Sequence, residues 1–166
     1  MCICICRNSN CVNATWKVGF GNDLVYSCRY TRVEIENRAR KAIKQTMLLN
    51  IHDELPSDAS ILPVDCITGI LALTGASRDR EDFEGILQKL SRWLHPGGSV
   101  ILVLVLNSDY YTTGMLKFPC VNLNTEFVLG SLSRADFSDV LFTVHPVPKQ
   151  NGKWSYMFVS AKSSLN

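Results

Sequence analysis

Residues 79–106 read DREDFEGILQKLSRWLHPGGSVILVLVL and predict a helix that ends at a turn and is followed by a buried strand. Apolar residues recur at helical spacing in the first half, so we expect an amphipathic helix from Asp79 to Leu94. These residues are Phe83, Ile86, Leu87, Leu90 and Leu94. The segment His95-Pro96-Gly97-Gly98 stops this helix. Ser99–Leu106 is then a continuous apolar run, typical of a strand covered on both faces.

Around this unit the sequence alternates strand and helix patterns. A buried-strand pattern, VDCITGI, lies within Ile61–Leu73, and a second helix is expected over Asn124–Ala135 with Asn124 as its cap. The other expected elements are a helix over Thr31–Thr46 and strands over Met47–Ile51, Val140–Val147 and Trp154–Ala161. The stretch 107–123 is expected to be irregular and aromatic. This order predicts an α/β fold with a mostly parallel sheet and an antiparallel edge.

Length and composition exclude several classes of protein. The chain has 166 residues, room for one domain, and its 46% hydrophobic and 19% charged residues are typical of a globular chain. Its net charge of +2 gives no bulk attraction to nucleic acid or to an anionic membrane. The longest apolar run, Val100–Leu106, is too short to span a bilayer. We interpret the basic residues of the helix expected over Thr31–Thr46 as a solvated face.

The cysteines are odd in number and scattered, which does not indicate a disulfide framework. They are Cys2, Cys4, Cys6, Cys11, Cys28, Cys66 and Cys120. We therefore expect a cytoplasmic protein with reduced thiols and interpret Cys66 as a small core residue. The first four could form a thiolate zinc site, but their spacing differs from that of common zinc motifs. The alternative is a cysteine-rich extension over 1–15, with the domain over 16–166.

Two features together resemble a known superfamily. Leu62-Pro63-Val64-Asp65-Cys66-Ile67 is followed by the helix described above and then by the Pro-Gly-Gly turn and apolar strand. This arrangement resembles the fourth strand, following helix and fifth strand of the class I S-adenosylmethionine-dependent methyltransferases. Proline stops the helix, and the two glycines allow a tight reversal before the buried strand.

A narrower resemblance follows this strand. Ser108-Asp109-Tyr110-Tyr111-Thr112-Thr113-Gly114, with Lys117-Phe118 after it, is similar to a segment of the nicotinamide N-methyltransferase family. That family includes the phenylethanolamine, indolethylamine and thioether methyltransferases. Upstream, Arg40-Lys41-Ala42-Ile43-Lys44-Gln45 and Leu49-Asn50-Ile51 match another of its segments. The resemblance runs from about Trp16 to Lys162.

The resemblance implies a Rossmann-like sheet and S-adenosylmethionine as cofactor. Members of the family carry a strand that ends in a glycine-rich loop around the cofactor, as in the analogous dinucleotide-binding fold. Gly19-Phe20-Gly21 is the only candidate here, and no convincing strand precedes it. We therefore expect a partial methyltransferase domain that lacks the N-terminal strands and the glycine-rich loop.

The resemblance also implies the site residues. Asn50 and Ile51 match positions that contact the adenine, and an asparagine oxygen can still accept from its amino group. Ile70 is expected to wall the cofactor. The expected substrate-binding residues are Leu71, Ser108, Tyr111 and Cys120. No catalytic acid or base and no metal ligand is assigned, because methyl transfer is an in-line displacement that depends chiefly on positioning.

Two acidic positions of the family are not acidic here. The aspartate that orients the substrate matches Leu104, and the acidic residue after the fourth strand matches Thr74.

Two hypotheses about function follow. The chain is an N-methyltransferase of small amines or pyridines, or it is a catalytically inactive remnant or interaction module. Without the N-terminal strands, Met47–Ile51 and the fourth strand would leave apolar edges or pair directly, so we also expect self-association through an exposed edge or a rearranged sheet.

Overall fold

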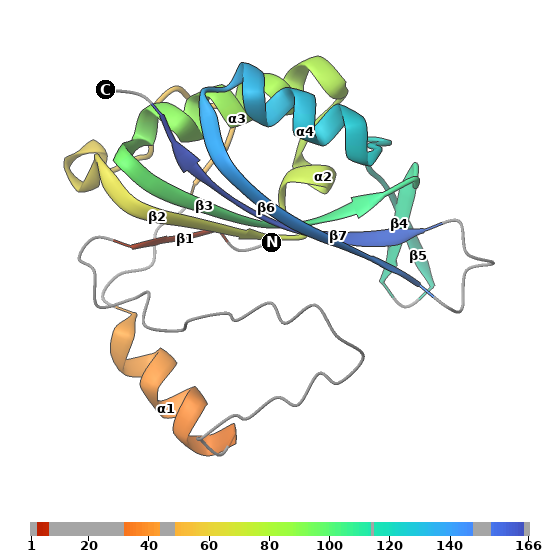
Figure 1. Ribbon diagram of the computed structural model, residues 1–166. Helices are drawn as coiled ribbons and strands as arrows, with labels where there is room; N and C mark the ends of the chain where they lie inside the picture. The colour runs from red at the N-terminus through yellow and green to blue at the C-terminus, as the bar shows by residue number, and fades with distance from the viewer. Residues whose placement is uncertain (1–2, 7–31, 44–48, 114, 148–153, 165–166) are drawn as a thin grey trace.

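The computed structural model describes residues 3–6, 32–43, 49–113, 115–147 and 154–164 (Figure 1). The strands are β1 (Ile3–Cys6), β2 (Val64–Ile70), β3 (Leu94–Leu106), β4 (Tyr110–Thr113), β5 (Leu116–Pro119), β6 (Phe137–Pro146) and β7 (Ser155–Ser163). The helices are α1 (Arg32–Ala42), α2 (Leu73–Ala76), α3 (Arg80–Trp93) and α4 (Thr125–Arg134), with a short 3-10 turn, η2 (Ala59–Ile61).

The main sheet has five strands in the order β1-β2-β3-β7-β6. Strand β2 pairs with β3 in parallel, whereas β7 pairs antiparallel with both β3 and β6. The fold is therefore a mixed α/β fold with antiparallel C-terminal strands, as the sequence predicts. Helix α3 connects the two parallel strands and therefore runs antiparallel to them, so that it begins at the edge of the sheet where β2 ends.

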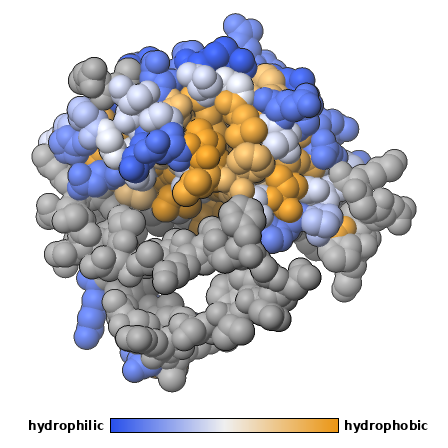
Figure 2. Space-filling view, viewed as in Figure 1, coloured by the Kyte–Doolittle hydropathy of each residue, from blue (hydrophilic) through white to orange (hydrophobic). Residues whose placement is uncertain are grey.

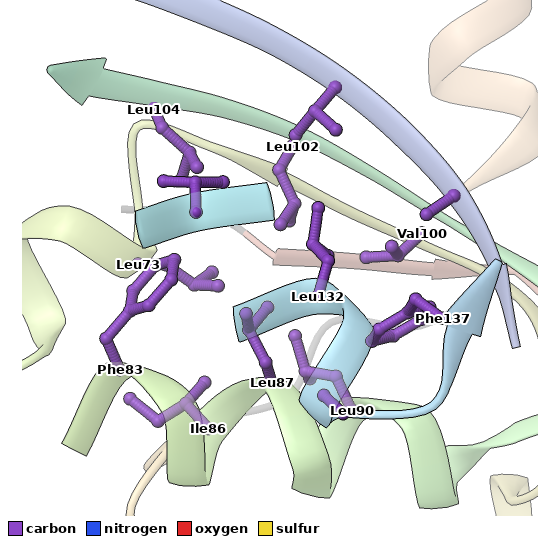
Figure 3. Packing of buried hydrophobic residues seen from close by; sticks show 14 of the residues in the cluster. Leu73, Phe83, Ile86, Leu87, Leu90, Val100, Leu102, Leu104, Leu132 and Phe137 are labelled. Carbon is purple, nitrogen blue, oxygen red and sulfur yellow. The ribbon is translucent and has the colours of Figure 1, made fainter. Parts of the chain in front are cut away.

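Helices α3 and α4 cover one face of the sheet and form the core with it (Figures 1 and 3). Val100, Leu102 and Leu104 alternate along β3 toward these helices and are fully buried. The predicted helical stripe from Phe83 to Leu90 meets them from α3. Cys66 is also buried, in agreement with its interpretation as a small core residue.

Side-chain caps begin α3 and α4; Asn124 is the cap that the sequence predicts, whereas Asp79, expected inside the helix, is its N-cap. The Asp79 carboxylate accepts from the backbone N–H of Asp82 at 2.8 Å, and the Asn124 side chain accepts from the N–H of Phe127 at 2.8 Å. These bonds satisfy backbone donors that have no partner inside the first turn of a helix. The caps fix where α3 and α4 begin.

The turn His95-Pro96-Gly97-Gly98 ends α3 as predicted, but strand pairing begins earlier than predicted. Leu94 pairs with Val64, and the register then shifts before Ser99 pairs with Cys66. Gly97 has a φ of 74°, and a Cβ on Gly98 would lie 2.9 Å from the carbonyl oxygen of His95. The two glycines therefore form a bulge at the start of β3 rather than a separate loop.

Three predictions of secondary structure are wrong or lie partly outside the described residues. Met47 and Leu48 are not described, and no strand includes Leu49–Ile51. The reason lies in Asn50, whose side-chain oxygen accepts from the N–H of His52 at 3.2 Å and so stabilises a turn. The stretch 107–123 contains the β4–β5 hairpin instead of irregular chain, because Tyr110–Thr113 and Leu116–Pro119 pair antiparallel. Helix α1 ends at Ala42, short of the predicted Thr46.

Of the alternatives expected for the edge beside β2, a bare edge is wrong and the sheet is rearranged there. Strand β1 pairs antiparallel along it, with Ile3 opposite Gly69 and Cys6 opposite Cys66. Part of the cysteine-rich segment is therefore an edge strand of the main sheet. The predicted boundary near residue 15 lies outside the described residues.

We predict that Leu102→Ala lowers the free energy of unfolding by about 2–5 kcal/mol, because Leu102 is fully buried and truncation leaves a cavity. Leu116→Ala is the matched control, since Leu116 is 65% exposed and its truncation is expected to cost about 0.5 kcal/mol or less. Urea unfolding followed by tryptophan fluorescence measures both. Equal costs for the two variants would contradict the assigned core.

An ion pair links α3 to α4 and makes stability depend on pH. Glu84 accepts from the Ser131 hydroxyl at 3.0 Å and from Nε of Arg134 at 3.2 Å. The hydrogen bond from Arg134 is the main cause that lowers the pKa of Glu84 below its usual 4.5, while burial opposes the shift. Because the folded pKa is the lower one, this stabilisation is present above pH 4.5 and is lost as the pH falls through the folded pKa.

We predict that Glu84→Gln removes this part of the acid sensitivity. The stability difference between wild type and Glu84→Gln should shrink as the pH is lowered below 4.5, the usual pKa of the carboxyl. Urea unfolding at a series of pH values measures it. A stability difference that stays constant with pH would contradict the assignment.

Candidate functional site

The two parallel strands end at the same edge of the sheet, and the chain turns sharply after each. Leu71 follows β2 with a φ of 54°, and Asn107 follows β3 with a φ of 57°. The N–H of Leu71 donates to the carbonyl of Val103 at 2.9 Å, and the N–H of Asn107 donates to Leu123 at 2.8 Å. Ligands of α/β sheets bind outside the carboxyl ends of such strands, so this edge is the candidate site.

Ile70 and Leu71 expose apolar side chains at this edge. Ile70 is 58% exposed and Leu71 is 37% exposed, although the residues that follow them, Ala72 and Leu73, are buried. Two exposed apolar side chains at the end of a buried strand provide a surface on which a flat ring could lie. Ile70 is the residue expected to wall the cofactor and Leu71 is one of those expected to bind the substrate, and both lie at this edge.

Ser108 and Cys120 lie together at the same edge. The thiol of Cys120 donates to the carbonyl of Ser108 at 3.4 Å, and the Ser108 hydroxyl donates to the carbonyl of Tyr110 at 2.6 Å. The N–H of Val121 donates to Thr74 at 2.9 Å, which joins the Cys120 segment to helix α2 after β2. Of the predicted substrate residues, Leu71, Ser108 and Cys120 are thus held around the two strand ends.

Tyr111 lies in the β4–β5 hairpin. Its ring stacks on Phe118 with centroids 5.3 Å apart. Tyr110 alternates to the other face of the hairpin, where Nζ of Lys117 lies 3.6 Å from its ring centroid and Trp154 meets it edge-on at 5.1 Å. A hollow of about 310 Å³ opens on that second face and is lined by Asp109, Tyr110, Lys117 and Pro119. The hairpin therefore separates Tyr111 from this hollow.

Asn50 and Ile51 form a turn instead of a strand end. The Asn50 amide donates to the Asp53 carboxylate at 2.9 Å, while its oxygen accepts from His52 as described above. Ile51 is buried, and its carbonyl accepts from Nζ of Lys89 at 2.9 Å. The side-chain oxygen of Asn50 therefore already has one partner, and a second lone pair is left to accept from a ligand.

Side chains of α3 hold this turn in place, and they were not predicted from the sequence. Besides Lys89, Nδ1 of His52 lies 3.4 Å from the Asp82 carboxylate, and the Trp93 indole donates to the carbonyl of Glu54 at 3.1 Å. His52 thus contacts the first turn of α3, and Glu54 contacts its last turn, so the segment lies along this helix. The Lys89 and Trp93 contacts join residues 38 or 39 positions apart, so no local motif reveals them.

The two residues that the resemblance matches to acidic positions of the family belong to the core. Leu104 is fully buried beside Leu73 and Phe83 (Figure 3), and Thr74 is 2% exposed. Neither presents a side chain to solvent at the candidate site. A carboxylate does lie close to the Ser108–Cys120 contact: it belongs to Asp109, which accepts from the Asn122 amide at 2.8 Å.

The zinc site considered for the first four cysteines lies largely outside the described residues. Cys2 and Cys11 are outside the described residues, and only the backbone of Cys4 and Cys6 is described. Within the described part of the chain, no group of three or more histidine, cysteine, aspartate or glutamate side chains could hold a metal ion. None of the helices described is long and apolar enough to cross a membrane.

A family model described as the NNMT/PNMT/TEMT family matches residues 27–161. The chain belongs to this family. It is 31% identical over 112 residues to human nicotinamide N-methyltransferase, an alignment that covers 67% of this chain and 42% of that protein. It is 25% identical over 122 residues to human phenylethanolamine N-methyltransferase, covering 70% of this chain and 43% of that protein. The chain thus spans less than half the length of these relatives.

Solved structures agree with the fold of the family. A SAM-dependent methyltransferase from Methanosarcina mazei is similar with a TM-score of 0.55 and 15% identity, covering 82% of this chain and 80% of that one. The [4+2]-cyclase SpnF is similar with a TM-score of 0.51 and 14% identity, and the match covers 82% of this chain and 65% of that one. One of these two proteins is a cyclase, so this likeness shows the fold and not the reaction.

We predict that the Cys120 thiol reacts slowly with iodoacetamide near neutral pH. Burial, and next to it the negative charge of Asp109, raise the pKa of Cys120 above its usual 9.0, so the reactive thiolate forms only at higher pH. Asp109→Asn removes that charge and should shift the pH profile of alkylation to lower pH. Mass spectrometry of the peptide that contains Cys120 measures the rate. An unchanged profile in Asp109→Asn would contradict the assigned contribution of Asp109.

Proposed function

We propose that the chain binds S-adenosylmethionine at the carboxyl edge of β2 and β3 and acts as an N-methyltransferase of a small amine or pyridine. The observation that carries the proposal is the family match over residues 27–161, together with the position of the expected site residues at that edge. A cytoplasmic location with reduced thiols is part of the proposal. The described free cysteines, Cys66 and Cys120, are compatible with it.

For the cofactor, the proposal uses Asn50, Ile51 and Ile70. The exposed side chain of Ile70 fits the apolar face of an adenine ring, and the free lone pair of the Asn50 oxygen fits its amino group. The bond between Lys89 and Ile51 would keep this turn in place. When bound, S-adenosylmethionine supplies an electrophilic methyl group on its sulfonium sulfur.

For the substrate, the proposal uses Leu71, Ser108, Tyr111 and Cys120. The stacked rings of Tyr111 and Phe118 and the side chain of Leu71 offer apolar surface to an aromatic or alkyl group. The Ser108 hydroxyl donates to the carbonyl of Tyr110. The proposal therefore gives Ser108 the role of shaping the loop around the substrate rather than of accepting a proton. The chain thus supports the reaction by orientation, which is the main requirement of an in-line displacement.

A second candidate function is a non-catalytic remnant or interaction module. The identities of Leu104 and Thr74 favour it, because neither side chain carries a carboxylate that could bind the accepting nitrogen, and both are buried. Both candidates predict the same fold. They differ in whether the folded chain binds the cofactor.

Calorimetric titration of the folded chain with S-adenosylhomocysteine separates the two. The proposal predicts micromolar binding, which Ile70→Asp weakens at least tenfold because a carboxylate then faces the adenine. Val33→Asp is the matched control, since Val33 is also an exposed apolar residue, 64% exposed on α1, and its replacement should leave the affinity unchanged.

Transfer of a labelled methyl group to nicotinamide or to phenylethanolamine then tests the reaction itself. Methyl transfer that Tyr111→Ala reduces supports the assigned substrate residues. No binding by a chain that melts cooperatively would overturn the proposal and leave the non-catalytic function.

A further inference from the structure

Strand β1 closes the edge of the main sheet beside β2. It has four residues, stands at the end of the strand order and pairs with β2 alone. Its last residue, Cys6, lies directly opposite Cys66, and the four residue pairs follow one another without a register shift. So short a strand at the end of a sheet is held by few backbone hydrogen bonds, and such ends open more readily than the core.

The other edge of the sheet, β6, is not closed in this way. Leu141, Phe142 and Val144 are exposed on it, and Figure 2 shows hydrophobic side chains gathered at the centre of the face in view, where β6 runs in Figure 1. Among the residues described, no strand lies along the outer side of β6. Within this part of the chain, the one closed edge of the sheet therefore depends on how β1 is held against β2.

The backbone register places Cys6 and Cys66 within reach of a disulfide. Residues directly opposite in an antiparallel pair share a face of the sheet, and their Cα atoms are about 4.5 or 5.5 Å apart. A disulfide joins Cα atoms that are about 4.4–6.8 Å apart, so either kind of pair allows one. Sγ of Cys66 also lies 4.0 Å from Oγ1 of Thr68, which places both side chains on the same face of β2.

Cys4 lies on the same face of β1 as Cys6 but one step further along it. It stands opposite Thr68 and is therefore a diagonal neighbour of Cys66. Diagonal neighbours are about 7–8 Å apart, and cysteines whose Cα atoms are more than about 7 Å apart cannot be bridged unless the backbone moves. Of the two cysteines in β1, the register thus selects Cys6 as the partner of Cys66.

We propose that Cys6 and Cys66 form a reversible disulfide that fixes β1 to the sheet when the surroundings become oxidising. The oxidant is a low-molecular-weight disulfide such as glutathione disulfide. The Cys6 thiolate attacks it and releases one small thiol, and the Cys66 thiolate then attacks the Cys6 sulfur and releases the second. Two electrons pass from the cysteines to the small disulfide, and the two cysteine protons end on the two released thiols. Because Cys66 is 3% exposed, the mixed disulfide forms on Cys6.

The disulfide makes the pairing of β1 conditional. In the reduced protein, β1 is held by its pairing with β2, whereas in the oxidised protein it cannot separate from β2 at Cys66. The bond also closes a loop of about sixty residues, which removes conformations from the unfolded chain. In a cytoplasm that keeps thiols reduced, such a bond is transient and responds to redox conditions. This inference does not depend on methyl transfer.

Peptide mapping of the full chain tests the pairing. The reduced protein is equilibrated in a buffer of oxidised and reduced glutathione, remaining thiols are blocked with N-ethylmaleimide, and a tryptic digest is analysed without reduction. Peptide 1–7 should be linked to peptide 45–78, whose only cysteine is Cys66, and dithiothreitol should separate them. Because peptide 1–7 holds three cysteines, variants identify the partner. Cys6→Ser should lower the yield of this link at least tenfold, whereas Cys4→Ser, the matched control on the same strand, should leave it unchanged.

Thermal melting of the same samples tests the effect on the fold. The oxidised wild type and oxidised Cys4→Ser should melt about 10 °C above their reduced forms, because closing a long loop destabilises the unfolded chain. Cys6→Ser should melt at the same temperature in both buffers, and its cooperative transition shows that it is folded. Peptide 45–78 linked to another peptide or to none, a link that survives Cys6→Ser, or a wild-type melting temperature that oxidation leaves unchanged would overturn the proposal.

Discussion

The pairing of β2 with β3 is the interaction on which the rest of the structure depends. It aligns two strands in parallel, so that both end at the same edge of the sheet, and it requires α3 to cross the sheet between them. Strand β3 is also paired with β7 on its other side, and its side chains form the centre of the core. The candidate site and the β4–β5 hairpin follow the end of β3. The antiparallel strand β7 pairs along β3, and β6 pairs with β7.

The sequence was sufficient to predict those elements whose signals are local. The helices at 79–94 and 124–135 have caps and apolar stripes, and Ser99–Leu106 is continuously apolar, so each is recognisable by itself. The β4–β5 hairpin was not predicted, because Tyr110–Thr113 and Leu116–Pro119 become strands only by pairing with each other. The place of β1 could not be predicted either, since its partner lies some sixty residues further along the chain.

The candidate site was predictable to a similar degree. The resemblance located residues that follow β2 and β3, and the structure brings Leu71, Ser108 and Cys120 to one edge. It did not foresee that the segment at Asn50 turns instead of extending, because that turn depends on side chains of α3 that are distant in sequence. The position of a residue after a strand can be inferred from the sequence pattern. The distant side chains that hold the residue in place cannot.

The burial of Leu104 has a consequence for how this chain could change in evolution. An aspartate at this position would now lie among Leu73 and Phe83, where an unpaired carboxylate costs several kcal/mol, comparable with the whole stability of many domains. Leu104→Asp would therefore be tolerated only if the residues around it became polar as well. The packing of β3 against α3 thus excludes a carboxylate at this position.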